Sequence, residues 1–379
     1  MKIILATPIY PPEIGGPATY TIEIATRLRT SHDITVVAYT DAVEEVDGTK
    51  LICVKKNRPL PLRLLSFFFT LFRAAKGADV IYAQNAMAAG LPAMLVGKLR
   101  RIPVVVKFVG DEAWERATQS RQTSKRLEEF LESKDGNIKI RLMKWIEGVV
   151  LRNVAIVTTP SAYLLEVLKK TYHFPAERGV VNYHAVDPVA IDTAVSRSPH
   201  QIITTARLVA WKGVEGIIEA VSVLKNKFPD VKLLIAGDGP ERKKLEERVR
   251  DLAVTNHVQF LGRISHDEAL AGQQESIVGV LNSTYEGLPH IVLENFATKT
   301  PIVATNIPGT NETVYHEQTG LLVEPGDSNG LAAAIARVFE DVALREKIVA
   351  GGEKLLREKF SWQSHISTLL GIFTSLTRK

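Results

Sequence analysis

Short uninterrupted runs of apolar residues, rich in Val and Ile, recur along the whole chain, and a longer amphipathic segment follows most of them. Continuous rather than alternating hydrophobicity indicates strands that are covered on both faces, as in a parallel sheet between helices. The segment Glu241–Leu252, for example, has charges on one side and Leu245 and Val249 on the other, which is typical of a helix packed by one face. The runs that predict strands are Lys2–Ala6, Ile34–Ala38, Val80–Tyr82, Pro103–Phe108, Val154–Thr158, Gln201–Thr205, Val231–Ala236, Val258–Phe260, Ile277–Leu281 and Ile302–Ala304.

The alternation of strand and helix occurs twice, which predicts an α/β protein with two Rossmann-like, doubly wound parallel-sheet domains. The length of 379 residues agrees with this, because a domain averages about 150 residues. Between the halves, Asp187–His200 loses the periodicity and gains Pro, Ser and Asp, as a linker does. We therefore expect one domain over 1–190 and a second over 200–360, followed by a helix that begins near Ser361.

Composition excludes several classes of protein. With 45% hydrophobic and 23% charged residues, the chain is neither disordered nor fibrous. Its longest weakly polar run, 81–97, is interrupted by Gln84, Asn85 and Pro92 and is too short to span a membrane. The single cysteine, Cys53, cannot form an internal disulfide, and the apolar run near the N-terminus is too short for a signal peptide. We expect a soluble cytoplasmic protein.

Positive charge is concentrated in the first half of the chain. The net charge is +5, and residues 1–187 contain 26 Lys or Arg against 19 Asp or Glu. This excess favours an anionic partner, such as a phosphate group or an anionic lipid, or it reflects only a slightly cationic surface. Nucleic acid is not expected, because the basic residues are scattered and no recognition motif is present.

Charged residues follow several predicted strands of the second half, at the carboxyl ends where open parallel sheets bind ligands. Arg207 comes directly after a strand and Lys212 stands at a predicted helix start, so the two could hold a diphosphate or form ordinary surface ion pairs. Glu286 lies in a later loop, and Glu294 lies in a helix that Pro289 opens and that has almost no polar face. A carboxylate buried there needs a partner, either the vicinal hydroxyls of a ribose or a structural salt bridge.

The first half has fewer polar residues at its predicted strand ends. Gly15 and Gly16 follow the first strand and precede a predicted helix. Two such glycines bring backbone N–H groups close to an anion, or they form a flexible turn. Asp111 follows the strand that ends at Phe108. We expect the strand ends of the two domains to face each other across a deep cleft.

Motifs of other enzyme classes are missing from the sequence. A dinucleotide fingerprint G-x-G-x-x-G that starts at Gly237 fails, because Arg242 occupies the third glycine position, and a plain strand-to-helix turn is the better interpretation. There is no P-loop, no spacing typical of metal ligands and no G-x-S-x-G element. We therefore expect neither a metal nor a cofactor.

Taken in order, these elements make the chain resemble the family-4 glycosyltransferases, retaining enzymes of the GT-B fold that use nucleotide-sugar donors. The resemblance covers nearly the whole chain. It rests on Pro-Pro-x-x-Gly-Gly at 11–16, Val-Gly-Asp at 109–111, Arg207-x4-Lys212-Gly213, Gly-Asp-Gly-Pro at 237–240, an E-x7-E element from Glu286 to Glu294, Gly309-x-x-Glu312, Gly-Leu-Leu-Val at 320–323 and Phe-Ser-Trp at 360–362.

The resemblance implies an enzyme that moves a hexosyl group from a nucleotide sugar to a glycan or lipid-linked acceptor, with retention and without a metal. It implies that the domain at 1–190 binds the acceptor, that the domain at 200–360 binds the donor, and that 361–379 packs back on the first domain. The implied catalytic residues are Asp111, Glu286, Arg207 and Lys212. The implied donor-binding residues are Gly15, Gly16, Arg207, Lys212, Arg263, Ile264, Glu286, Gly287, Leu288, Pro289, His290, Ile291, Glu294, Gly309 and Thr310.

Within this scheme Arg207 and Lys212 hold the donor diphosphate, assisted by Gly16 and by a helix after Gly309. The ribose is expected on Glu294. The remaining implied contacts are the backbone at Arg263 and Ile264 for the base, Glu286 and the Gly287–Ile291 segment for the transferred sugar, and Asp111 near the reacting carbon.

Two positions depart from the family pattern. Thr310 stands where a second glycine is usual, so the backbone there approaches a phosphate less closely. The stretch Phe108–Asp111 lacks the histidine of many relatives, which leaves Asp111 as the polar residue expected at that point.

Two other classes of protein are alternatives. An NAD-dependent oxidoreductase also has paired nucleotide-binding domains, but the broken third glycine argues against it. A non-catalytic, two-lobed nucleotide- or sugar-binding protein is usually exported, and the sequence predicts no export signal.

Three basic segments, at 58–73, 98–101 and 139–152, predict peripheral contact with anionic lipid on the inner face of a membrane. The first of them contains Phe67–Phe69, which are alternatively ordinary helix core.

Overall fold

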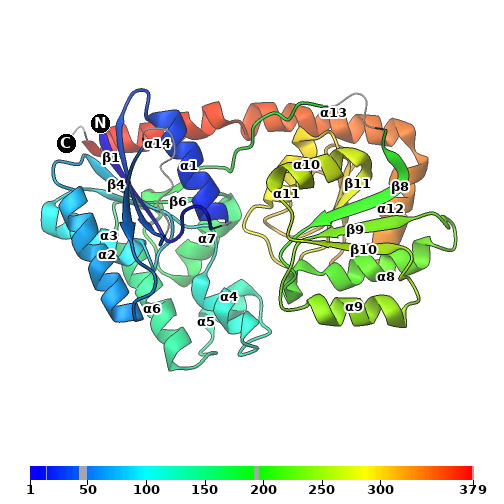
Figure 1. Cartoon of the computed structure of the whole chain (residues 1–379), viewed down its shortest axis with the longest axis horizontal. Coiled ribbons are helices and arrows are strands. Elements are labelled where there is room, and N and C mark those ends of the chain that lie inside the picture. Colours follow the sequence, from blue (N-terminus) through cyan, green and yellow to red (C-terminus); the bar gives the residue numbers. More distant parts are fainter. Residues whose placement is uncertain (14, 42–48, 192–195, 378–379) are drawn as a thin grey trace. The chain divides into compact units, whose positions relative to one another are not determined.

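The computed structural model describes residues 1–13, 15–41, 49–191 and 196–377. The chain divides into two compact units (Figure 1). Unit 1 comprises Met1–Asn182 together with Ile366–Lys379, and unit 2 comprises Tyr183–His365. The chain passes into unit 2 shortly before the stretch Asp187–His200 that loses helical periodicity, and its last helix brings it back into unit 1.

Unit 1 is a seven-stranded parallel sheet between two layers of helices, with the strand order β3-β2-β1-β4-β5-β6-β7. Its strands are β1 Lys2–Thr7, β2 Asp33–Tyr39, β3 Lys50–Val54, β4 Val80–Ala83, β5 Val104–Lys107, β6 Ile156–Thr159 and β7 Gly179–Val181. Its helices are α1 Gly16–Leu28, α2 Leu60–Ala74, α3 Gly90–Arg100, α4 Glu112–Gln119, α5 Leu127–Glu132, α6 Ile138–Asn153, α7 Ala162–Thr171 and α14 Trp362–Thr377, with a 3₁₀ turn at Ala176–Arg178. Figure 1 shows α2 and α3 on one side of this sheet and α1 and α14 on the other.

Unit 2 repeats this plan with a six-stranded parallel sheet, in the order β10-β9-β8-β11-β12-β13. Its strands are β8 Ser198–Thr205, β9 Lys232–Ala236, β10 Val258–Gly262, β11 Ser276–Leu281, β12 Ile302–Thr305 and β13 Leu321–Val323. Its helices are α8 Val214–Leu224, α9 Arg242–Asp251, α10 His266–Glu275, α11 His290–Ala297, α12 Ser328–Glu340 and α13 Val342–Lys359, with a 3₁₀ turn at Ala210–Lys212. Helices α8, α9 and α12 pack side by side, and α10 packs against α11 (Figure 1).

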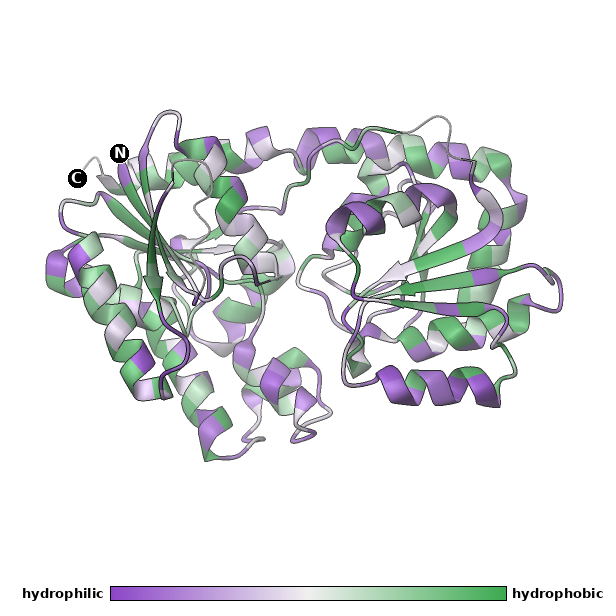
Figure 2. Cartoon of the chain, in the orientation of Figure 1, coloured by the Kyte–Doolittle hydropathy of each residue, from purple (hydrophilic) through white to green (hydrophobic). Residues whose placement is uncertain are grey.

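The strands form where the sequence predicts them because their side chains are buried on both faces. β1, β4 and β5 are almost entirely buried, and Figure 2 shows the strands of both sheets in the hydrophobic colour. Helix α9 is mostly hydrophilic in the same view and buries only Leu245 and Val249. Side-chain caps fix several helix starts: Ser161 caps α7, and Ser265 forms a capping box with Glu268 at α10.

All ten predicted strands are confirmed, and the structure adds β3, β7 and β13. Each of the three added strands is the outermost strand of its sheet. β3 and β7 have one neighbour each and stay mostly partly exposed, so their residues need not be continuously apolar. β13 is mostly buried, but it is only three residues long. The predicted helices at Glu241–Leu252, after Pro289 and near Ser361 correspond to α9, α11 and α14.

The last helix belongs for most of its length to unit 1. The ring of Phe373 in α14 lies 5.6 Å from that of Tyr82 in β4, edge to face, and both side chains are fully buried. Among the described residues, no helix has the length and the apolar content that crossing a membrane requires.

Candidate active site

The carboxyl ends of the parallel strands in unit 2 form one edge of the sheet, and the charged residues predicted to act there lie along it. Arg207 follows β8 by two residues, and Glu286 lies in the loop after β11. Lys212 ends the 3₁₀ turn that precedes α8. β8 and β11 are neighbours in the sheet, so their loops are adjacent. Arg207 is exposed, and its guanidinium carbon lies 5.5 Å from the centre of the Trp211 ring.

Lys212 and Glu286 form an ion pair between these two loops. The Nζ of Lys212 lies 2.5 Å from Oε1 of Glu286, and the same oxygen accepts a hydrogen bond from Oγ of Ser283 at 2.6 Å. The Lys212 side chain is 22% exposed and that of Glu286 only 9%. Within the described part of the chain, Oε2 of Glu286 accepts no hydrogen bond. The pair therefore presents a cation and an unused carboxylate oxygen to a ligand that carries both phosphate and hydroxyl groups.

A close backbone contact holds the loops of β8 and β11 together. Gly213 has a φ of 60°, and a Cβ there would lie 2.0 Å from the carbonyl oxygen of Asn282, so no other residue fits. The Nδ2 of Asn282 donates to the carbonyl of Gly213 at 2.8 Å, and the N–H of Thr284 donates to the carbonyl of Trp211 at 2.8 Å. This contact fixes Lys212 and Glu286 relative to each other before any ligand binds.

Glu294 lies on α11 with its side chain 16% exposed. Its Oε1 lies 3.7 Å from Nδ1 of His266, in the first turn of α10. Burial raises the pKa of the Glu294 carboxyl, against the opposing effects of His266 and of a hydrogen bond with Gln273. Because His266 is itself 65% exposed, this contact is not the buried structural salt bridge that was the alternative to a ligand. Hydroxyl donors from a ribose would satisfy this carboxylate.

The turn at Gly237–Gly239 is a plain strand-to-helix turn, as predicted. A Cβ on Gly237 would lie 1.9 Å from the carbonyl oxygen of Ala206, and one on Gly239 would lie 2.3 Å from that of Leu208. Both glycines thus serve the packing of this turn against the backbone after β8. Arg242, in place of the third glycine, sets its guanidinium 4.7 Å from the centre of the Phe260 ring.

Other predicted donor-binding residues lie in neighbouring loops of the same sheet edge. Arg263 is 82% exposed, and its Nε lies 3.8 Å from Oδ2 of Asp238. Ile264 is half-buried, whereas Leu288 and Ile291 are buried. His290, the first residue of α11, is exposed with its ring centre 4.2 Å from that of His184. The apolar members of the Gly287–Ile291 segment anchor this loop, and Pro289 is the N-terminal cap position of α11.

The helix predicted after Gly309 is wrong. Residues 308–313 form consecutive turns, and the described chain between β12 and β13 contains no helix. The N–H of Thr310 donates to the carbonyl of Ile307 at 3.0 Å, and the Thr310 side chain is fully buried. Gly309 packs its Cα against Glu286, because a Cβ there would lie 1.9 Å from the Glu286 carbonyl oxygen. This turn packs against the backbone of the Glu286 loop. Because it is not a helix, it supplies no helix dipole to bind a phosphate.

In unit 1, Asp111 is fully buried, as the N-terminal cap of α4. Its Oδ1 accepts from the N–H of Trp114 at 2.7 Å, and its Oδ2 accepts from the hydroxyl of Tyr172. Burial raises the pKa of the Asp111 carboxyl. Both oxygens are thus used inside the unit, and contact with a sugar would require these hydrogen bonds to be replaced. In the structure Asp111 caps α4, and its expected contact near the reacting carbon stays a prediction.

Glu112, the next residue, was missed by the sequence analysis. Its Oε1 accepts from Nδ2 of Asn85 at 2.6 Å, and its N–H donates to Oε1 of the fully buried Glu147 at 3.0 Å. Burial raises the pKa of Glu112 to about 7, helped by the nearby charges of Glu115 and Asp111. The pattern Asp-Glu directly after a strand was the only signal for this position, and it does not say which carboxylate is buried.

Gly15 and Gly16 stand at the start of α1. Gly15 is extended, and its carbonyl accepts the N–H groups of Ala18 and Thr19 at 2.9 and 3.2 Å. A Cβ on Gly16 would meet no atom within 4 Å, so the glycine leaves open space at this point. The first turn of α1 carries no acidic residue.

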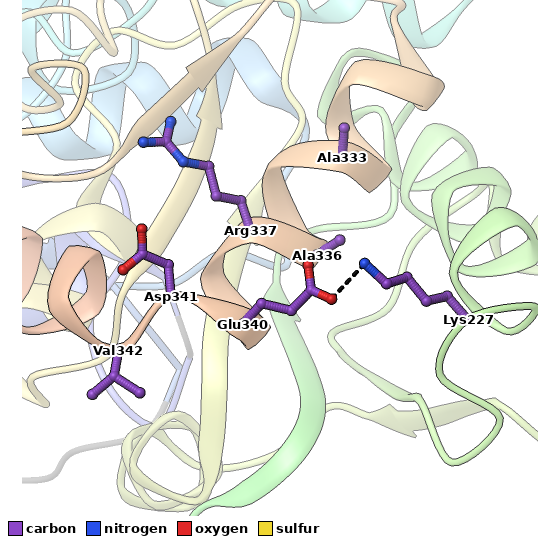
Figure 3. A pocket seen from close by; sticks show the side chains of 7 residues that line it. All are labelled: Lys227, Ala333, Ala336, Arg337, Glu340, Asp341 and Val342. Carbon is purple, nitrogen blue, oxygen red and sulfur yellow. Dashed lines mark ion pairs between the residues drawn. The ribbon is translucent and has the colours of Figure 1, made fainter.

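A pocket of about 650 Å³ lies elsewhere on unit 2 (Figure 3). It is lined by α12 residues, by the start of α13 and by Lys227, which pairs with Glu340. None of the predicted site residues lines it, and it is not at the carboxyl ends of the strands. Among the described residues, no three His, Cys, Asp or Glu side chains are grouped so as to hold a metal ion.

Two family models match the chain in succession. Residues 14–189 match the model described as glycosyltransferase family 4, and residues 192–355 match the model described as glycosyl transferases group 1. The lipopolysaccharide core biosynthesis glycosyltransferase LpsD of Rhizobium meliloti is 34% identical over 172 residues, which are 45% of this chain and 48% of that protein. Glycogen synthase of Mycobacterium tuberculosis is 24% identical over an alignment that covers 100% of this chain and 95% of that protein.

Solved structures share the fold over almost the whole chain. Anabaena Alr3699/HepE, in a complex with UDP and glucose, superposes with a TM-score of 0.78 at 19% identity, covering 99% of this chain and 100% of that one. Sucrose-phosphate synthase from Thermosynechococcus elongatus gives a TM-score of 0.80 at 20% identity, covering 99% of both chains. These likenesses identify the fold as GT-B.

Proposed function

We propose that this chain, which belongs to the family-4 glycosyltransferases, transfers a hexosyl group from a nucleotide sugar to a glycan or lipid-linked acceptor, with retention at the anomeric carbon. Unit 2 binds the donor and unit 1 binds the acceptor. The observation that carries the proposal is the Lys212–Glu286 ion pair at the carboxyl edge of the unit 2 sheet, with Arg207 after β8 and Glu294 on the helix after β11. The structures of Alr3699/HepE with UDP and UDP-glucose support a nucleotide-sugar donor.

Arg207 and Lys212 act on the leaving group. Departure of the nucleoside diphosphate leaves an oxocarbenium-like sugar and places new negative charge on the β-phosphate. Fixed cations stabilise that charge, at about 2.7–4 kcal/mol for each donor when judged from oxyanion-hole deletions. Lys212 is held in place by Glu286, and Arg207 lies beside Trp211. Both cations are therefore positioned before the charge develops.

Glu286 and Glu294 position the donor. The unused oxygen of Glu286 accepts a hydroxyl of the transferred sugar, and the buried carboxyl of Glu294 accepts the ribose hydroxyls. The backbone around Arg263 and Ile264 faces the base. Each contact replaces water by a fixed polar group, which orients the anomeric carbon for attack.

The proton of the attacking acceptor hydroxyl goes to the departing phosphate oxygen in this proposal. Retention then follows when the acceptor attacks from the same face that the phosphate leaves. Proton NMR of the product tests this step, because an α-linked donor must give an α-linked product. A product of inverted anomeric configuration would contradict it.

Activity is expected to need no metal, since cations of the chain neutralise the diphosphate. Addition of EDTA should leave the rate unchanged. A rate that falls with EDTA and returns with Mg²⁺ would overturn this part of the proposal.

A donor screen tests the activity itself. Purified protein is incubated with UDP-glucose, UDP-galactose, UDP-N-acetylglucosamine or GDP-mannose, and release of UDP or GDP is measured with and without acceptor sugars. We expect slow release from one donor, accelerated by an acceptor and lost in Lys212→Ala. If no donor is consumed and neither UDP nor GDP raises the melting temperature, while NAD does, the oxidoreductase alternative gains.

Peripheral binding to an anionic membrane is the second part of the proposal, and α2, α3 and α6 of unit 1 would supply the surface. α2 packs against α3 and α3 against α6 (Figure 1). The three helices contain eight Lys or Arg residues and one acid, Glu147, which is fully buried. Their large exposed apolar side chains are Leu60, Leu62, Leu65, Phe69, Leu95, Leu99, Ile138, Leu142 and Trp145. Exposed apolar groups among unopposed cations are typical of a surface that lies on anionic lipid.

The three phenylalanines of α2 divide between these roles. Phe67 is fully buried and stacks on Tyr39 with ring centres 4.3 Å apart, so it belongs to the core. Phe68 is half-buried, and Phe69 is 50% exposed. Of these three phenylalanines, Phe69 is the one exposed enough to contact lipid.

Vesicle co-sedimentation tests the membrane surface. The wild-type protein should bind vesicles that contain phosphatidylglycerol and should not bind pure phosphatidylcholine. Leu142→Ser combined with Trp145→Ser should lower binding several-fold, since both side chains are more than half exposed on one face of α6. Val223→Ser combined with Val342→Ser, at exposed positions of unit 2, is the control. Equal binding of both double variants would contradict the proposed surface.

A further inference from the structure

A row of polar side chains crosses the carboxyl end of the otherwise apolar sheet of unit 1. Lys107 is the last residue of β5 and pairs in register with Thr158 of β6. Ala83 of β4 pairs with Val106, so Gln84 directly after it continues the ladder beside Lys107. The N–H of Gln84 donates to the carbonyl of Ala6 at 2.9 Å, which confirms that the ladder extends that far. These positions are therefore neighbours on one face of the sheet.

Lys107 is a buried lysine that has no anionic partner in the described part of the chain. Its side chain is 5% exposed, and its Nζ lies 2.9 Å from the centre of the Tyr20 ring. The hydroxyl of Tyr20 is in turn 3.0 Å from that of Tyr82. Among the described residues, the side chain of Lys107 forms no hydrogen bond or ion pair. Burial lowers the pKa of Lys107.

Gln84 supplies a second unused donor beside this cation. The residue is 2% exposed, and its buried Nε2 has no hydrogen-bond partner among the residues that the structure describes. A native interior rarely leaves an amide N–H unpaired, because the loss costs about 1–3 kcal/mol. Among the described residues, two neighbouring donors of this sheet end, the Gln84 amide and the Lys107 ammonium, thus lack an acceptor.

Helix α1 contacts Lys107 through its second turn. Tyr20, on whose ring the Lys107 ammonium rests, is in the second turn of α1. The first turn of that helix carries no acid, and Gly16 leaves open space there. A helix N-terminus, a buried cation and a buried amide donor all favour the same kind of group, an oxyanion.

We propose that Lys107 and Gln84 form an anion subsite in unit 1 that binds an oxyanion of the acceptor, such as a phosphoryl group or a carboxylate. The inference rests on the proposed function for the assignment of unit 1 to the acceptor. The donor diphosphate has its own cations in unit 2, Arg207 and Lys212, so this subsite is left for a second anion. The acceptor is then an acidic glycan or a phosphate-linked one rather than a neutral sugar.

Binding of inorganic phosphate in the presence of saturating UDP tests the subsite. Excess UDP occupies the diphosphate contacts, and isothermal titration then reports a second anion site; GDP replaces UDP if it is the nucleotide that binds. We expect wild-type protein to bind phosphate with 1:1 stoichiometry, and we expect Lys107→Met and Gln84→Leu each to weaken binding about tenfold or more. A parallel titration with acetate separates a carboxylate site from a phosphoryl site.

Lys144→Met is the matched control, because Lys144 is another partly buried lysine of unit 1. Its Nζ donates to the carbonyls of Phe130 and Ser133 at 3.3 and 3.1 Å, so it has the partners that Lys107 lacks. Lys144→Met should lower the melting temperature and leave phosphate affinity unchanged. Lys107→Met should not lower the melting temperature, since it removes an unpaired buried charge.

Three results would overturn the subsite. Wild-type protein with UDP bound that takes up neither phosphate nor acetate would do so, as would phosphate binding that survives Lys107→Met. A melting temperature that falls in Lys107→Met as it does in Lys144→Met, with no change in phosphate affinity, would show that Lys107 only supports the fold. None of these outcomes depends on turnover, so the subsite can fail while the proposed transferase activity stands, and the activity can fail while the subsite stands.

Discussion

The two units share one architecture but place charge differently at the carboxyl ends of their strands. In unit 2 the charged side chains reach the surface: Arg207 is exposed, and the Lys212–Glu286 pair is partly so. In unit 1 the charged side chains are buried. Asp111 is fully buried as the N-terminal cap of α4, and Lys107 is 5% exposed. The same fold thus builds an open charged edge on one sheet and a buried one on the other.

The difference teaches which charged residues are ready to bind a ligand. A charge at the surface keeps much of its hydration and can exchange water for a phosphate at little cost. A buried charge has already lost its hydration, so it must have a partner within the fold or await one from outside. Asp111 has two partners in unit 1, whereas Lys107 has none among the described residues.

Substitution of the unit 2 cations, Arg207 and Lys212, should have the largest effect on turnover. If it has none, the charged edge of unit 2 is not the ligand-binding edge. Lys212→Ala or Arg207→Ala should lower turnover by roughly two or more orders of magnitude, because each removes a fixed donor to the leaving phosphate. The measurement is kcat with the donor found in the screen. Lys227→Ala, an exposed lysine paired with Glu340, is the control and should behave as wild type. Near wild-type rates for both Lys212→Ala and Arg207→Ala would show that neither side chain binds the diphosphate.

Asp111 offers the sharpest test of the unit 1 side. Asp111→Ala should destabilise the protein by about 1–3 kcal/mol, because α4 loses its cap and the buried Tyr172 hydroxyl keeps only the longer of its two hydrogen bonds, the one to Glu147. Asp111→Asn keeps a capping oxygen and should lose less than half as much. Urea unfolding followed by fluorescence measures both.

The activity of Asp111→Asn decides between a cap and a substrate contact. A cap predicts turnover close to wild type at a temperature where the variant is folded. A variant that is fully stable yet turns over a hundredfold more slowly would instead place Asp111 in contact with the sugar, as the sequence predicted.

Glu112 predicts a pH-dependent stability in unit 1. Its pKa is about 7 in the folded protein against 4.5 unfolded. A raised acid pKa means that folding favours the protonated form, so the benefit is complete below pH 4.5 and is lost as pH rises through 7. Glu112→Gln should therefore stabilise unit 1 at pH 8 by up to about 3 kcal/mol and change little at pH 4.5. Hydrogen exchange at α4 and β4 measures the difference, and equal effects at both pH values would contradict the burial of this carboxyl.

Substitution of Thr310 should have the smallest effect on stability and on UDP affinity. Its Oγ1 is buried without a partner and its N–H is bonded to Ile307, so neither contacts a ligand in the structure. Thr310→Val should be neutral or stabilising by about 1 kcal/mol and should leave the dissociation constant of UDP within twofold. A large loss of UDP affinity would restore Thr310 to the donor site as the sequence predicted.

The sequence predicted every inner strand but only one of the four outermost strands, β10. Central strands such as β1 and β5 bury both faces and must be continuously apolar, which leaves a clear pattern. β3 and β7 are bordered on one side only, and most of their residues stay partly exposed. Their composition is not forced, so no comparable pattern marks them.

The positions of the exposed candidate residues could be predicted from the sequence. Arg207, Lys212 and Glu286 follow strands in sequence, and parallel pairing of β8 and β11 brings their loops together. Lys107 and Asp111 also stand at the end of β5, but the sequence does not tell which of them finds a partner inside the fold. That depends on Tyr172 and Glu147, which lie far from them along the chain. The helix after Gly309 was implied by the family resemblance alone; in the structure the N–H groups of Thr310 and Asn311 both donate to the carbonyl of Ile307 within consecutive turns.

A crystal structure of the protein soaked with UDP, or with GDP if UDP does not bind, tests the central claim most directly. We predict the two phosphates within hydrogen-bond distance of Arg207 and Lys212, with the ribose hydroxyls on the carboxylate of Glu294. A nucleotide bound anywhere else, with these three side chains making no contact to it, would contradict the donor site described here.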